Sequence, residues 1–328
     1  MALGATALAR LSPKSIQPMS AQRMQLPDGR WHFQHGPMDI IIDAHGLADA
    51  VKVAHERAWA RFSCILDELV SELAALRSPV GRDCQLQGPI ARRMWNACRP
   101  FSRGFITPMA AVAGAIAQEL AACYVASGVA RAWVNNGGDI ALHLGPSQSV
   151  RIGLYADIGQ LDARDIRNGI SGDMRTDGQF EVHSAMPVRG VATSGWRGRS
   201  FSLGIADSVT VLARNAAEAD AAATVIANAV NIDDARIARR PACDVKDDSD
   251  LASIPVTVLV PELEPELVTS ALNAGLKRAN ELRAAGLIWS AVLVCQNQIF
   301  TSSHAAAGML SDSDENTVKG RQVGSVFA

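Results

Sequence analysis

The order of strand-like and helix-like segments is the strongest constraint on how this chain folds. Long stretches carry apolar residues at helical spacing, and short stretches alternate apolar with polar residues as strands do. The helix-like stretches are residues 48–77, 109–127, 216–230 and 264–285. The strand-like stretches are residues 29–35, 37–43, 132–135, 140–144, 150–154, 179–183, 206–213, 256–260, 289–295 and 298–301. This order predicts an α+β fold in which a mixed sheet has long helices packed mainly on one face.

Length and local composition indicate one domain between two tails. The chain has 328 residues, enough for a large core, and we expect a single domain over residues 28–308. Residues 1–27 contain no acidic side chain. They fit a flexible tail, which we favour, or a targeting peptide whose apolar part is short. Residues 309–328 include the run Ser311–Asn316 and are expected to form a polar tail.

Charge and cysteine usage argue against several classes of protein. The formal net charge is -2, so no basic field indicates a nucleic-acid partner. No apolar run approaches the roughly 20 residues that cross a membrane. The six cysteines are dispersed without a CxxC pair, which argues against a zinc knuckle or a disulfide framework. We therefore expect a cytoplasmic protein with reduced thiols and a small-molecule ligand, and leave a homo-oligomer open.

The stretch from Ala192 to Arg199 has the composition of a ligand-binding loop. It offers small residues, the hydroxyls of Thr193 and Ser194, and the guanidinium of Arg197. The planar fork of arginine suits a phosphate or a carboxylate. The alternative is a surface loop whose arginines face water. Ser194 or Thr193 is also a candidate nucleophile, although no nucleophile elbow surrounds either residue.

Asp220 and Thr224 form a narrow polar stripe on the helix-like stretch that follows. Residues four apart lie on one face of a helix, so both side chains point the same way. Carboxylate and hydroxyl oxygens are the hard ligands that Mg²⁺ prefers. An aspartate early in a helix also complements the helix dipole, so a purely structural role is the alternative.

A second segment with site-like chemistry is the turn Asn135–Asp139. Gly137 and Gly138 fit a tight turn because they accept positive φ at little cost. Turn formation explains the glycines, but it explains Asp139 less well. The helix-like stretch before this turn has a face of small residues, namely Ala110, Ala113, Gly114 and Ala117. Such a face permits either tight packing or the close approach of a flat ligand.

Three segments together resemble the ApbE-like superfamily, and within it a branch of uncharacterised conserved proteins. They are Pro108–Ala117, Val134–Ile140, and Ala192–Gly195 with the helix that carries Asp220 and Thr224. The best-studied members of the superfamily are FAD:protein FMN transferases, which use Mg²⁺ to cleave FAD and attach FMN to a threonine. The resemblance implies a T-fold-like architecture over most of the chain.

The resemblance also implies roles for individual residues. Asp220 and Thr224 match metal-binding positions, so Mg²⁺ is expected there. FAD or another flavin is expected to contact the two glycine-containing segments through Asn136, Gly137, Gly138, Asp139, Thr193, Ser194, Gly195 and Arg197. Asp207 and Ser194 are the expected catalytic residues.

The chain departs from the transferases at three places. Ala113 replaces a lysine, Gln118 replaces an aspartate, and residues 201–207 lack the histidine and proline of a His-x-x-Asp-Pro segment. Two classes of function remain. The first is a metal-assisted enzyme acting on a flavin-, nucleotide- or pterin-like molecule, which the retained acids favour. The second is a non-catalytic protein that binds such a molecule and has lost FMN transfer, which the departures favour.

Overall fold

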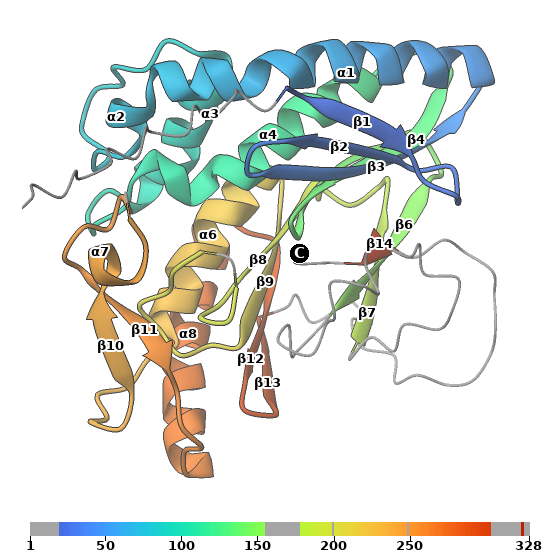
Figure 1. Cartoon of the computed structure of the whole chain (residues 1–328). Coiled ribbons are helices and arrows are strands. Elements are labelled where there is room, and N and C mark those ends of the chain that lie inside the picture. Colours follow the sequence, from blue (N-terminus) through green and yellow to red (C-terminus); the bar gives the residue numbers. More distant parts are fainter. Residues whose placement is uncertain (1–19, 155–177, 199, 248, 303–322, 325–328) are drawn as a thin grey trace, which may run out of the picture.

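The centre of the fold is a nine-stranded sheet (Figure 1). The computed structural model describes residues 20–154, 178–198, 200–247, 249–302 and 323–324. The strands are, in the order in which they lie side by side, β1 (Gln22–Gln25), β2 (Trp31–His35), β3 (Met38–Gly46), β4 (Val129–Asn136), β5 (Asp139–Leu144), β8 (Gly190–Ser194), β9 (Ser208–Ala213), β12 (Ser290–Cys295) and β13 (Gln298–Ser302). All neighbours in this sheet pair antiparallel. The parallel pairing that a mixed sheet implies occurs instead in a smaller sheet.

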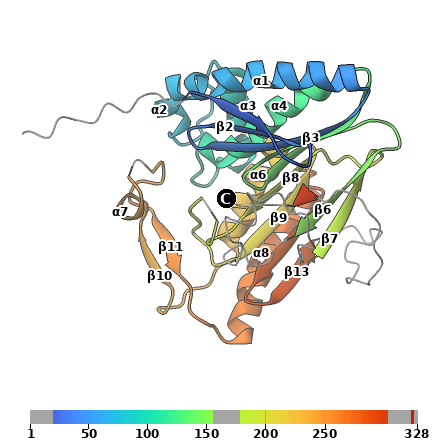
Figure 2. The same cartoon turned by 45° about the vertical axis from the view of Figure 1, so that its right-hand side comes forward.

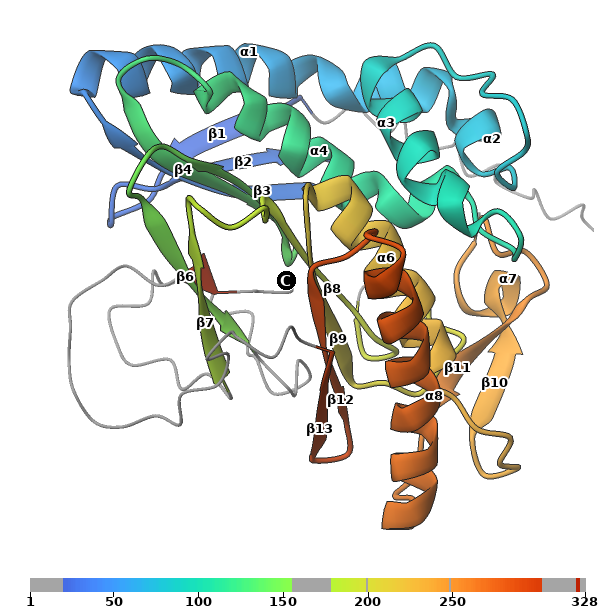
Figure 3. The ribbon, with the colours of Figure 1, turned by 180° about the vertical axis from the view of Figure 1, so that it is seen from behind.

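Long helices cover one face of this sheet (Figure 3). The longer helices are α1 (Ala48–Ser71), α3 (Pro89–Cys98), α4 (Val112–Ala121), α6 (Ala216–Ala229) and α8 (Pro265–Ala284). The short ones are α2 (Leu73–Leu76), α7 (Ala242–Val245), and the 3₁₀ turns η1 (Arg99–Phe101), η2 (Pro108–Ala111) and η3 (Ala122–Tyr124). α4 packs on β4 and β5, and α6 packs on β8 and β9. The predicted α+β class, with helices mainly on one face, is confirmed.

Apolar side chains fill both faces of the sheet because successive residues of a strand point to opposite sides. In β9, Val211 belongs to the core under the helices, whereas Leu212 belongs to a second cluster on the other face. Leu293 and Val292 of β12 divide in the same way. The second cluster is shared with a three-stranded sheet made of β6 (Ser149–Leu154), β7 (Gly178–His183) and β14 (Val323–Gly324). The two clusters therefore share one sheet as their common wall.

A small two-stranded unit lies on the opposite side of the molecule from β6 and β7 (Figure 2). It consists of β10 (Ala238–Pro241) and β11 (Pro255–Leu259), with α7 between them in the chain. The stretch between α6 and β11 carries many charged residues and contains β10 and α7. The strand predicted at residues 256–260 is β11, and it lies outside the nine-stranded sheet.

Both predicted tails contain residues that pair in sheets. Gln22–Gln25 lies within the tail predicted for residues 1–27, yet it is β1 and pairs with β2. Val323–Gly324 lies within the tail predicted for residues 309–328, and it pairs in parallel with Ile152 and Gly153. The boundary at residue 27 is therefore placed too late. Residues 1–19 and most of 309–328 lie outside the described residues.

Two helices are shorter than predicted. The helix expected over residues 48–77 breaks because Glu72 has φ -113 and ψ 13. The Glu72 carboxylate accepts the N–H groups of Gln87 and Gly88 at 2.6 and 2.7 Å, just before α3 begins. The helix expected over residues 109–127 begins as the 3₁₀ turn η2 and is α-helical only from Val112 to Ala121.

Candidate functional site

The tight turn between β4 and β5 is the first part of the site. Gly137 and Gly138 have φ of 63° and 109°. Glycine adopts such positive φ values at little cost, which is why this tight turn contains glycines. The N–H of Gly138 donates to Oδ1 of Asn135 at 2.8 Å, which closes the turn. Asp139 follows as the first residue of β5 and is only 7% exposed. Its Oδ1 accepts the N–H of Thr193 in β8 at 3.2 Å.

Asp220 joins this turn from α6. Its Oδ2 accepts the N–H of Gly114 at 2.9 Å, and the N–H of Ala113 also bonds to its carboxylate. These N–H groups belong to the first turn of α4, where a helix has no partners of its own. Ala111 occupies the N-cap of α4 and has no side-chain oxygen to supply. Asp220 therefore caps α4 from another helix.

Asn136 fixes the turn to the same helix end. Its Nδ2 donates to the carbonyl oxygen of Ala113 at 3.1 Å. Asn136 and Asp139 are paired across the two strands, so both side chains point to the helix-covered face. We call Asn136, Asp139, Asp220 and the backbone of Ala113–Gly114 the paired-carboxylate site.

The two carboxylates at this site have unusual electrostatics. Burial raises the pKa of Asp139 well above its ordinary value, and the charge of Asp220 raises it further, while the Thr193 N–H lowers it. Burial raises the pKa of Asp220 to about 7, opposed by the N–H groups of Gly114 and Ala113. Within the described ranges, no lysine or arginine pairs with either carboxylate. Both acids thus lie in a place that disfavours their charged form.

The donor set at the site suits a hard divalent cation. Asp139 and Asp220 supply carboxylate oxygens, and Thr224 follows one turn after Asp220 on the same face of α6. The described residues contain no group of three or more histidine, cysteine, aspartate or glutamate side chains arranged to hold a metal. Backbone oxygens, the Thr224 hydroxyl or water would therefore complete the coordination of a Mg²⁺ ion. The residues present fit such an ion, since it would neutralise two neighbouring carboxylates.

Thr193 and Ser194 are strand residues, which corrects the loop expected from Ala192. Gly190–Ser194 is β8, bonded on one side to β5 and on the other to β9. The Thr193 hydroxyl bonds to the Thr210 hydroxyl at 2.9 Å. Both side chains alternate with residues of the helix-covered core, so they lie on the other face of the sheet. The structure thus brings the Thr193 N–H to Asp139, but not the Thr193 hydroxyl.

Asp207 lies at a separate cluster beyond the end of β8. Its Oδ2 accepts the N–H of Gln296 at 2.6 Å, and its Oδ1 accepts Nε1 of Trp196 at 3.3 Å. Nε of Arg197 lies 3.3 Å from the same Oδ1. At Gly195 a Cβ would lie 2.3 Å from the carbonyl oxygen of Asp207, so this glycine permits the close approach. The structure brings Arg197 and Gly195 to Asp207 and places Ser194 next along the chain.

The backbone of α4 is the part of the site that the residue pattern did not reveal. A Cβ at Gly114 would lie 2.3 Å from the carbonyl oxygen of Ala216 and 2.9 Å from Cβ of Asp220. Of the two readings of the small-residue face, tight packing holds at this position, and the partner is α6. The signal that was present is Gly114 itself, because a glycine inside a helix indicates a close neighbour. Its hydrogen bond to Asp220 has no sequence signature.

Comparisons with known proteins identify relatives of this chain. It is 39% identical over 146 residues to a UPF0280 protein of Methanothrix thermoacetophila, which covers 44% of this chain and 54% of the relative. It is 36% identical over 203 residues to a UPF0280 protein of Methanosarcina barkeri, covering 61% of this chain and 72% of the relative. The chain thus spans about half the length of the first relative. A crystal structure of Pseudomonas stutzeri flavinyl transferase ApbE in its apo form is 15% identical with a TM-score of 0.35, covering 88% of this chain and 96% of that one.

The family assignment follows from a model that spans most of the chain. The model described as "AbpE bacteria" matches residues 23–301, which include every residue of the paired-carboxylate site. The match confirms the resemblance that Pro108–Ala117, Val134–Ile140 and Ala192–Gly195 indicated. The chain belongs to the AbpE bacteria family, an uncharacterised branch of the ApbE-like proteins.

Proposed function

We propose that this chain is a metal-assisted, transferase-like enzyme that binds Mg²⁺ at the paired-carboxylate site and acts on a flavin-, nucleotide- or pterin-like molecule. One observation carries the proposal: Asp139 and Asp220 lie close enough for their charges to interact, and no described cationic side chain pairs with them. Two buried like charges are costly unless a cation or a proton joins them. A divalent cation is the partner that suits both oxygens and charge.

The residues of the site divide the work in this proposal. Asp139 and Asp220 hold the ion, and the Thr224 hydroxyl is the third candidate ligand. Oδ1 of Asp139 accepts the N–H of Thr193, which leaves its Oδ2 for the ion. The Asp220 carboxylate accepts the N–H groups of Gly114 and Ala113 and would bind the ion through a remaining lone pair. When bound, Mg²⁺ offsets negative charge on a phosphate or on a leaving oxygen. FAD or another flavin is the ligand class we propose first.

A second candidate is a protein that binds the same class of ligand without chemistry. Asp207 favours this alternative, because its carboxylate already accepts from Trp196 and Gln296 and lies beside Arg197. A general base needs a carboxylate oxygen that is open to the substrate. The catalytic roles of Asp207 and Ser194 remain predictions in either case.

We also propose that the protein works in the cytoplasm. All six cysteines are free thiols, which suits a reducing compartment. No helix in the described ranges has the length and apolar character needed to cross a membrane.

Calorimetric titration with Mg²⁺ and Mn²⁺ tests the metal site. We expect saturable binding by the purified protein, weakened at least roughly tenfold in Asp139→Asn and Asp220→Asn, because each variant loses one charged ligand. Asp67→Asn is the matched control, since Asp67 is an exposed residue of α1 far along the chain from the site. No saturable binding, or equal binding by all three variants, would refute the metal site.

Ligand choice and chemistry need a separate measurement. A thermal-shift panel of FAD, FMN, purine nucleotides and pterins, each with and without Mg²⁺, identifies the class that binds. The ligand that stabilises the protein is then incubated with it and analysed by liquid chromatography. A new product that requires Mg²⁺ and Asp220 supports an enzyme. Binding without any product, under the same conditions, supports the non-catalytic alternative.

A further inference from the structure

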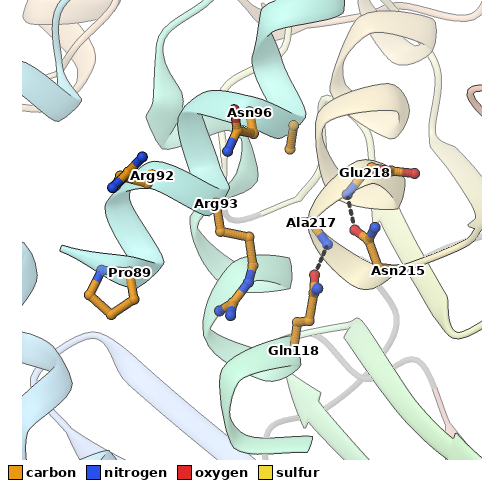
Figure 4. Close-up of a pocket in the computed structure, with 9 residues that line it drawn as sticks. Pro89, Arg92, Arg93, Asn96, Gln118, Asn215, Ala217 and Glu218 are labelled. Carbon is orange, nitrogen blue, oxygen red and sulfur yellow. Dashed lines mark hydrogen bonds between the residues drawn. The ribbon is translucent and has the colours of Figure 1, made fainter. Parts of the chain in front are cut away.

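A polar hollow lies between α3, α4 and the start of α6 (Figure 4). Its volume is about 500 Å³, which is within the usual range for small-molecule pockets. None of the residues that line it belongs to the paired-carboxylate site. The hollow is therefore a place that the proposed function does not use.

The oxygens of two amide side chains at this hollow are already occupied. Oε1 of Gln118 accepts the N–H of Ala217 at 3.4 Å, and Oδ1 of Asn215 accepts the N–H of Glu218 at 2.9 Å. Figure 4 shows both oxygens turned toward the first turn of α6. The NH₂ group of each amide has no hydrogen-bond partner among the described residues. Both side chains therefore present unused donors.

One positively charged side chain at the hollow has no ion-pair partner among the described residues. Glu218 pairs with Arg214 at 3.2 Å, so its negative charge is matched. Arg93 pairs with Glu119 at 2.8 Å, so its positive charge is matched as well. Arg92 lines the hollow and is exposed, and its guanidinium forms no ion pair or hydrogen bond with any described residue. The wall thus combines a net positive charge with unused N–H donors.

We infer that this hollow binds an oxyanionic group, a phosphate or a carboxylate, of a small molecule, with Arg92, Gln118 and Asn215 as the recognising residues. An oxyanion accepts hydrogen bonds and carries negative charge, which complements a wall of donors around one unpaired guanidinium. The fork of Arg92 matches two oxygens of either group. The site is a second ligand position, lined by none of the residues of the paired-carboxylate site.

Two variants separate this binding from effects on folding. Arg92→Gln removes the unpaired charge from an exposed position. Asn215→Asp keeps the oxygen that caps α6, and aspartate is as good an N-cap as asparagine, but it replaces the donor with a negative acceptor. Arg57→Gln is the control, because it removes the same charge from an exposed position on α1.

The test is calorimetric titration of the full chain with inorganic pyrophosphate and, separately, with citrate, in low salt with EDTA present. We expect at least one anion to bind saturably, with affinity reduced at least roughly tenfold in both Arg92→Gln and Asn215→Asp, and unchanged in Arg57→Gln. The stronger of the two anions tells whether phosphate or carboxylate is preferred. The inference is overturned if neither anion binds, if Asn215→Asp binds as well as the native chain, or if Arg57→Gln loses as much as Arg92→Gln. Asp220→Asn should bind the anion normally, so that failure here is distinct from failure of the metal site.

Discussion

At the scale of single residues, the Asp220 side chain makes two kinds of interaction. One oxygen caps the first turn of α4, while the carboxylate as a whole interacts with the charge of Asp139. Asparagine could keep the first interaction, because its side-chain oxygen accepts an N–H as a carboxylate does. It would abolish the second, because it carries no charge. The two roles of Asp220 are therefore separable by a single substitution.

This separation predicts a pH dependence of stability in the absence of metal. The pKa of Asp220 rises from 3.8 to about 7 on folding, so between these values the folded protein keeps a proton that the unfolded chain releases. The contribution of this group to the free energy of unfolding should fall as pH rises from about 4 to about 7, and stay level above. Because Asp220 keeps some contact with solvent, we expect a loss on the order of 2 kcal/mol.

Chemical denaturation at several pH values measures this slope. Asp220→Asn should make this slope shallower, with the buried Asp139 supplying what remains, whereas the control Asp67→Asn should leave it unchanged. A slope that is identical in Asp220→Asn and the native protein would contradict the assignment. Added Mg²⁺ should stabilise the native protein most near and above pH 7, where the carboxylates are ionised.

The sequence predicted the conformation of residues that depends only on their own chemistry. It did not predict side-chain directions that depend on contacts with distant segments. The turn at Gly137 and Gly138 was predictable because positive φ has a strong residue preference. The direction of the Thr193 hydroxyl was not predictable, because it depends on Thr193 lying in β8, between the strands β5 and β9. The site roles of Ser194, Asp207 and Arg197 stay predictions.

At the scale of elements, long amphipathic helices were predictable and short paired strands were not. α8 and α6 differ from their predicted ranges only at the ends, because many residues contribute to their periodicity. β1 has the sequence QRMQ, without a strand pattern. Arg23 holds it by pairing with Glu56 at 3.0 Å and lying over the ring of Trp59. Such contacts between distant segments leave no periodic trace in the sequence.

The contact between α4 and α6 gives a prediction at this scale. A Cβ at Gly114 would lie 2.3 Å from a backbone oxygen of Ala216, which cannot rotate away, so Gly114→Ala should force the helices apart. We expect a loss of about 1–3 kcal/mol in the free energy of unfolding, as for overpacked cores. The same shift would move the N–H of Gly114 away from Asp220 and weaken Mg²⁺ binding.

Gly81→Ala is the matched control for this substitution. A Cβ at Gly81 would meet nothing within 4 Å. Its free energy of unfolding should stay within about 0.5 kcal/mol of the native value, as for most surface substitutions. Denaturant titration of both variants provides the comparison. Equal stability of Gly114→Ala and the native protein would show that α4 and α6 do not approach as closely as described.

At the scale of the whole molecule, the site lies where two groups of elements meet. α1 packs on β3 and α4 packs on β4 and β5, whereas α6 packs mainly on β8 and β9. The paired-carboxylate site takes Asn136 and Asp139 from the first group and Asp220 from the second. A ligand bound there would contact both groups, and an ion would hold them together. The fold class followed from the sequence because this arrangement needs only the order of strands and helices.

The last prediction concerns the reaction of the intact protein. The transferases that the chain resembles carry a lysine where Ala113 stands, and here Ala113 contributes only its backbone, which bonds to Asp220 and Asn136. The segment before β9 also lacks the histidine and proline, and its remaining Asp207 is engaged by Gln296. We therefore expect no transfer of FMN to a threonine-bearing acceptor when FAD and Mg²⁺ are supplied.

In-gel fluorescence measures this outcome directly. The protein is incubated with FAD, Mg²⁺ and an acceptor, and covalent flavin is sought on a denaturing gel, with an authentic flavinyl transferase as the positive control. Mg²⁺-dependent ligand binding that is lost in Asp220→Asn, without labelling of the acceptor, would mean that the site serves a different reaction or binding alone. Strong labelling would show that Ala113 and the altered segment before β9 do not prevent flavin transfer, and that this chain performs the chemistry of its better-studied relatives with a different set of residues.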